Sequence, residues 1–105
     1  MTSSAETHHD SSKRLRQLVA RGFRLMPPVR DKDGELMALI YVRPHGDIID
    51  IVELRGEDDV RAARVPRDDR IRDDRASTHW RTAGSVCEVL DQVLALPERL
   101  IRAWA

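Results

Sequence analysis

The chain has 105 residues and a mass of 12.0 kDa, which allows one domain with a real core and excludes two. Its 18 basic and 18 acidic residues cancel, so there is no net field to hold the molecule on a phosphate backbone. A single cysteine, Cys87, excludes an intramolecular disulfide framework and a cysteine-based zinc site, and it suits a reducing compartment.

The basic residues are almost all arginine, with Lys13 and Lys32 as the lysines. This bias is typical of a GC-rich genome and favours a bacterial source. The N-terminal stretch has no apolar signal core, and no segment approaches the roughly 18 apolar residues of a membrane span. We therefore expect a small bacterial protein of the cytoplasm.

The pattern of the chain changes at residue 12. Residues 1–11 are polar and offer nothing to offset the entropy of ordering, so we predict a disordered tail there and one domain over 12–105. A helical period starts at Ser12, with Leu15 and Leu18 on its apolar face and Gly22 as its stop.

Several strand-like stretches follow this helix. Phe23–Arg30 contains two prolines, which cannot donate to a central ladder, so it is expected at an edge. Val60–Val65 is predicted as a further strand at an edge because of its arginines, and Ser77–Thr82 as the last strand. Between them, residues 67–75 contain a near-repeat of Arg-Asp-Asp-Arg, and we expect an exposed loop stabilised by weak local ion pairs.

The most unusual stretch is the predicted hairpin over residues 34–56, because both of its strands are apolar on both faces. Alternation along a strand places side chains of one parity on each face. In the first strand the two sets are Leu36, Ala38, Ile40 and Val42, and Met37, Leu39 and Tyr41; in the second, after a turn at Pro44, His45 and Gly46, they are Ile48, Asp50, Val52 and Leu54, and Ile49, Ile51 and Glu53.

The C-terminal helix has the clearest local signal in the chain. Ser85 and Glu88 form a capping box, in which the serine caps the helix and the glutamate reaches back to it. Apolar residues then recur at helical spacing, and we predict a helix over 86–95. Pro97 follows it, and Leu100, Ile101 and Trp104 form a short apolar stripe.

These elements predict an α+β fold with two layers, in which an antiparallel sheet of three to five strands packs against an N-terminal and a C-terminal helix. If both helices cover one face, the other face is left for another chain. We therefore expect a non-catalytic interaction or regulatory protein that forms a homodimer or binds a protein partner. The candidate interface residues are Met37, Leu39, Tyr41, Ile49 and Ile51.

Three alternatives stay open. One helix could cover each face, which would give a three-layer monomer. The N-terminal helix could bind nucleic acid through a local basic patch, with the candidate contacts Arg14, Arg16, Arg21 and Arg24. A monomeric enzyme or ligand binder could instead use the turn at His45 and Asp47 together with His79 and Trp80.

The order of helix, strands and helix over residues 12–96 resembles in outline the double-stranded-RNA-binding domain. That family binds phosphate with a lysine-rich start of its last helix. At the corresponding place this chain has Ser85, Cys87, Glu88 and Asp91, so the resemblance is one of topology. It implies the fold rather than RNA binding.

The sequence holds few groups suited to catalysis or metal binding. Cys87 lies in the first turn of the last helix, where amides and the helix dipole can activate a thiol, but its place between two valines favours a buried, inert thiol. His45 and His79 do not match the spacing of a standard metal site. We expect no metal, no cofactor and no catalytic residue.

Overall fold

The computed structural model describes residues 4–67 and 80–97. These residues form an α+β fold with an N-terminal helix, an antiparallel sheet and a C-terminal helix, as the sequence predicts. In chain order the elements are α1 (Ser4–Ala20), β1 (Arg24–Leu25), β2 (Val29–Arg30), β3 (Leu36–His45), β4 (Ile48–Gly56), β5 (Asp59–Pro66), β6 (Trp80–Gly84) and α3 (Val86–Ala95).

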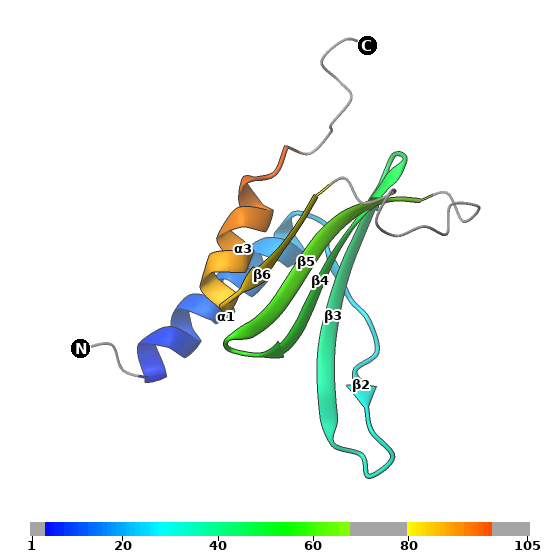
Figure 1. Cartoon of the computed structure of the whole chain (residues 1–105). Coiled ribbons are helices and arrows are strands. Elements are labelled where there is room, and N and C mark those ends of the chain that lie inside the picture. Colours follow the sequence, from blue (N-terminus) through cyan, green and yellow to red (C-terminus); the bar gives the residue numbers. More distant parts are fainter. Residues whose placement is uncertain (1–3, 68–79, 98–105) are drawn as a thin grey trace.

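The sheet has the strand order β1-β3-β4-β5-β6, with every pair antiparallel. The short strand β2 pairs with the first part of β3, and the two form an arm that projects beyond the end of β4 (Figure 1). The expected edge position of Val60–Val65 is wrong, because β5 lies between β4 and β6. The arginine Arg64 is tolerated on an internal strand because its guanidinium donates a hydrogen bond to the buried carboxylate of Asp50 on β4.

Both described helices pack on the same face of the sheet (Figure 1). The core joins Leu18 of α1 and four apolar residues of α3 to inward-facing residues of the central strands. The three-layer alternative with one helix on each face is therefore wrong for these two helices. We call the helix-covered face the inner face and the opposite one the outer face. The buried core residues are Leu18, Phe23, Tyr41, Val52, Val60, Ala62, Val86, Val89, Leu90 and Val93.

The two helices differ in how well the sequence predicts their limits. Helix α3 has the predicted bounds, and its capping box between Ser85 and Glu88 is present in both directions. Helix α1 starts at Ser4, which is earlier than the predicted start at Ser12. Extending a helix costs much less than nucleating one, so a polar segment can continue a helix that is already anchored. The expected loop over 67–75, apart from Arg67, and the apolar stripe after Pro97 lie outside the described residues.

The register of the β3–β4 hairpin corrects the predicted interface set. The turn consists of Gly46, at a φ of 60°, and Asp47, so that His45 pairs with Ile48. Odd-numbered residues of β3 therefore share a face with even-numbered residues of β4. Tyr41 lies opposite Val52 on the inner face, whereas Ile51 lies on the outer face. The set does not form one surface, because Pro44 and His45 belong to the strand rather than to the turn.

Candidate functional site

The outer face presents three rows of side chains across the four longest strands. Its centre is apolar, and Ile40, Val42, Ile49 and Ile51 are half-buried there. The first row is Ile40, Glu53, Arg61 and Ala83; the second is Val42, Ile51, Ala63 and Arg81; the third begins with Pro44, Ile49 and Val65.

Charged side chains of both signs stand at one end of this face. The carboxylate of Glu53 accepts hydrogen bonds from Arg55, whose Nη2 lies 2.7 Å from Oε2. Arg61 lies directly opposite Glu53 on the next strand and 3.8 Å from Asp59. Opposite charges at such cross-strand positions stabilise a sheet modestly, by about 0.2–1 kcal/mol. The face is therefore apolar over β3 and β4 and mixed in charge at the β4–β5 turn, with the exposed Arg81 on β6 at the end of the second row.

A shallow hollow of about 400 Å³ lies over the β5 and β6 side of the outer face. Its lining includes Ala63 and Ala83, whose short side chains leave space between the arginines of these strands. The β3 and β4 side carries isoleucine and valine instead. Ile51 and Glu53 of β4 also line the hollow. The outer face thus carries its larger aliphatic side chains on β3 and β4 and its hollow over β5 and β6, with β4 as one wall of the hollow.

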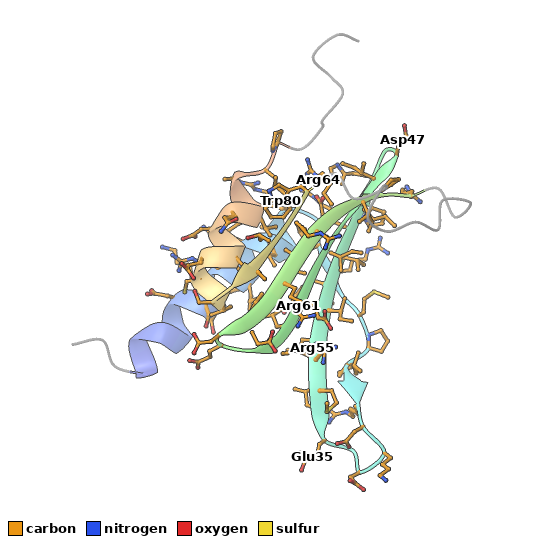
Figure 2. The ribbon with its side chains drawn as sticks, viewed as in Figure 1. Glu35, Asp47, Arg55, Arg61, Arg64 and Trp80 are labelled. Carbon is orange, nitrogen blue, oxygen red and sulfur yellow. The ribbon has the colours of Figure 1, made fainter. Side chains whose placement is uncertain are left out.

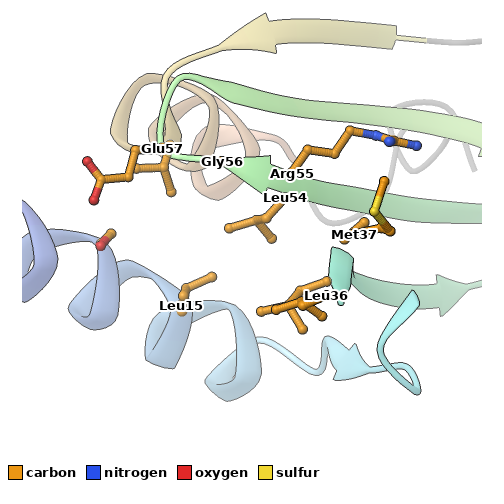
Figure 3. Close-up of a pocket in the computed structure, with 11 residues that line it drawn as sticks. Leu15, Leu36, Met37, Leu54, Arg55, Gly56 and Glu57 are labelled. Carbon is orange, nitrogen blue, oxygen red and sulfur yellow. The ribbon is translucent and has the colours of Figure 1, made fainter. Parts of the chain in front are cut away.

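A second apolar region involves the arm and the middle of α1. A pocket of about 240 Å³ lies where β3 and the end of β4 meet α1, and Figure 3 shows Leu15, Leu36, Met37 and Leu54 in its wall. Leu39 also lines it. Ligand pockets are usually about 300–1,000 Å³, so this one is small. Met37 and Leu39 of the predicted interface set therefore contribute to a different surface from Ile49 and Ile51.

An ionic cluster lies on the inner face, which sequence reasoning did not find. Arg43, Asp50 and Arg64 occupy one row across β3, β4 and β5. The Asp50 carboxylate, 2% exposed, accepts two hydrogen bonds from Arg64, at 2.6 and 3.0 Å, and one from Arg43 at 2.9 Å. His45 Nε2 lies 2.8 Å from the same carboxylate. Figure 2 places Arg64 at the end of the sheet that carries Asp47 and Trp80.

The surroundings of Arg43 explain how this cluster accommodates a second arginine beside Arg64. Its guanidinium lies 4.9 Å from the centre of the Phe23 ring, which is a cation–π contact, and its Nη1 donates to the carbonyl of Arg21. Gly22 precedes Phe23 with a φ of 102°, a conformation that favours glycine. The chain after α1 thus folds over Arg43, and the cluster links three strands to the end of the helix.

The cluster makes folding stability depend on pH. Burial alone raises the pKa of Asp50, but hydrogen bonds from Arg64, Arg43 and His45 outweigh it and hold the pKa below its ordinary value. Such a group stabilises the fold above the unfolded-state pKa of about 3.9, and the contribution is lost as the pH falls through the folded-state value. We expect the difference in unfolding free energy between wild type and Asp50→Asn to shrink as the pH is lowered from about 5 to about 3.

Urea unfolding of both proteins at several pH values measures this difference. If the difference stayed constant over the whole acid range, the Asp50 carboxylate would have the same affinity for protons in the folded and unfolded chains. The ionic cluster would then contribute nothing through its charge.

The four arginines predicted for nucleic-acid contact do not form one surface. Arg14 binds the carboxylate of Asp91 on α3, at 2.7 and 3.3 Å, and Arg21 donates to the carbonyl of Leu94. These two side chains join α1 to α3. Arg16 and Arg24 are exposed on different elements, so the basic face expected for the helix is reduced to Arg16.

The residues considered for catalysis are partly brought together. His45 belongs to the ionic cluster, and Trp80 lies opposite Arg64 on the neighbouring strand, so both are at the same end of the sheet. Asp47 is exposed at the turn, and His79 lies outside the described residues. Cys87 is half-buried against the core. Within residues 4–67 and 80–97 no group of three or more metal-ligating side chains comes together.

Neither α1 nor α3, the helices in the described part of the chain, has the length and apolarity that a membrane span requires. No protein-family model matches the chain. No curated protein and no solved structure is significantly similar to it. The outline shared with the double-stranded-RNA-binding domain is therefore supported by the order of elements alone.

Proposed function

We propose that this protein is a non-catalytic interaction module that binds another polypeptide through the outer face of its sheet. The observation that carries the proposal is that apolar side chains from neighbouring strands lie next to one another on that face, with Ile51 at their centre. Both described helices pack on the other face. Contiguous apolar surface of this kind usually marks an interface, because exposing it to water is unfavourable.

The composition of the face supports a protein partner over a nucleic acid. Its centre holds isoleucine, valine and alanine, and its charged end contains both signs. Phosphate binding needs an excess of cations, and the chain as a whole has none. The affinity would come from aliphatic burial, at about 25 cal/mol per Å² before the cost of association.

Capture of binding proteins by the tagged, full-length chain tests the proposal when wild type is compared with Ile51→Asp. We expect the variant to stay folded and to lose the bound protein. The matched control is Val19→Asp, which also replaces a β-branched aliphatic residue by an acid, at an exposed position of α1, and should leave binding intact. Binding that survives Ile51→Asp and is lost in Val19→Asp would place the interface on the helices and refute the proposal.

A further inference from the structure

We propose that the polypeptide covering the outer face is a second copy of this chain, in a two-fold dimer whose axis runs parallel to the strands above the boundary between β4 and β5. This inference rests on the proposed function and names its partner. A two-fold dimer uses the same patch on both copies, so the patch must be complementary to itself. The outer face meets this condition in shape and in charge.

The complementarity of shape follows from the larger side chains on β3 and β4 and the hollow over β5 and β6. Rotation about this axis lays β5 of the partner over β4, and β6 of the partner over β3, while each row stays opposite itself. Ile51 then faces the partner's Ala63, and Ile40 faces the partner's Ala83. At these two positions a large side chain meets a small one in the 400 Å³ hollow. At the other positions Val42 faces the partner's Arg81, and Ile49 faces the partner's Val65.

The complementarity of charge involves the first row. The same rotation places Glu53 opposite the partner's Arg61, and Arg61 opposite the partner's Glu53, because these two residues lie in one row on the strands beside the axis. The dimer would thus contain two ion pairs, and each copy would contribute Glu53 to one pair and Arg61 to the other. The chain has no net charge, so two copies do not repel each other at long range.

An axis perpendicular to the strands would not give this match. It would lay each strand over the same strand of the partner, running in the opposite direction. The first row of one copy would then face the third row of the other. Glu53 would then lie against the partner's Ile49, and Arg61 against the partner's Val65. Burying charged groups against aliphatic side chains is unfavourable, and this axis would also place Arg81 against the partner's Arg81. The parallel axis places Arg81 against the partner's Val42 at the margin of the face and pairs the charges of Glu53 and Arg61, so the charges favour the parallel axis.

The size of the face indicates a weak dimer. Four strands about 4.8 Å apart and three rows about 6.7 Å apart cover roughly 400 Å² of flat area. A specific interface of standard size buries about 800 Å² of accessible surface on each partner, and rough side chains expose more area than a flat projection. Face-to-face sheets pack about 10 Å apart, with strands within about 30° of each other. We expect a dimer that dissociates in the micromolar range or above, at about 1 µM to 1 mM.

Sedimentation equilibrium of the full chain across this concentration range tests the dimer, with four proteins compared. Wild type should self-associate, and Glu53→Arg and Arg61→Glu should each weaken association by about tenfold or more at low salt, since each places two like-charged pairs in the interface. An equimolar mixture of the two single variants should form a heterodimer as tight as the wild-type dimer. The double variant Glu53→Arg/Arg61→Glu should also recover self-association. Urea unfolding checks that each variant remains folded.

The remaining outcomes decide against the inference in different ways. A wild type that stays monomeric overturns the dimer. If such a monomer still binds a different protein in a manner that depends on Ile51, the proposed function stands and its partner is another chain. If nothing binds in that manner, both fail. A wild-type dimer whose mixed variants show no recovery uses another surface or another axis, which also overturns the inference.

Discussion

Replacement of Asp50 by Asn is expected to lower the free energy of unfolding by about 3–5 kcal/mol, which is the usual cost of removing one partner from a buried ion pair. The carboxylate is 2% exposed, and Arg64 is fully buried beside it. Without the negative charge, two guanidinium groups would share the inner face of the sheet with no counterion among the described residues. The loss is therefore due mainly to the buried charges that remain, rather than to the hydrogen bonds that disappear.

Urea unfolding at a fixed protein concentration measures this effect, because self-association would otherwise change the apparent stability. Asp47→Asn is the matched control: it lies at the exposed turn of the same hairpin and should change stability by less than about 0.5 kcal/mol. The double variant Asp50→Asn/Arg64→Met should lose less than the sum of its two single variants, since one unpaired cation is gone. A single variant Asp50→Asn as stable as wild type would show that the cluster does not hold the three strands together.

Replacement of Leu18 by Ala is expected to destabilise the fold by about 2–5 kcal/mol, through lost burial and the cavity left behind. Leu18 is fully buried, and it is the residue by which α1 enters the core with the apolar side of α3. A domain of this size has a total stability of about 5–15 kcal/mol. The variant should therefore lose a large share of its stability, and the docking of α1 should weaken.

The adjacent Val19 provides the control for this helix, because it is 55% exposed. Val19→Ala should change the unfolding free energy by less than about 0.5 kcal/mol, since alanine is also the better helix former. Urea or thermal unfolding of both variants gives the comparison. Equal losses at the two positions would mean that α1 does not cover the inner face as the structure shows.

The sequence is sufficient to predict the elements with strong local signals. The capping box at Ser85 and the helical spacing after it determine α3 to the residue, because a cap is a local interaction. The apolar character of both hairpin faces is also readable from alternation. The start of α1 cannot be predicted from the sequence, since residues 4–11 have no apolar face. Their helical state depends on continuation from the anchored part of the helix.

The sequence is insufficient where the answer depends on register. The choice between Pro44-His45-Gly46 and Gly46-Asp47 as the turn decides whether Tyr41 lies with Ile51 or with Val52, since a shift of one residue reverses every side chain. The two-residue turn is the tighter of the two and matches the twist of paired strands. With that register, Arg43, Asp50 and Arg64 fall into one row.

One signal could have revealed the ionic cluster. Asp50 lies between Ile48 and Val52, which are buried on the same face, and a lone acid on an apolar strand face implies a buried cationic partner. Arg64 occupies the corresponding position on the next strand, beside Ala62. Long-range pairing of strands was needed to connect them, and the sequence alone specifies only the candidates.

The central claim is that the described residues, 4–67 and 80–97, leave the outer face uncovered and that a partner covers it in the working state. Paramagnetic relaxation by a soluble probe, measured at the methyl groups of Ile40, Ile49 and Ile51, tests it most directly, with the buried Leu90 as the internal reference. In dilute solution these isoleucine methyls should relax strongly and those of Leu90 weakly, and the isoleucine methyls should become protected as the chain associates. Outer-face methyls that are as protected as Leu90 in the dilute monomer would contradict the claim, because the chain itself would then cover that face.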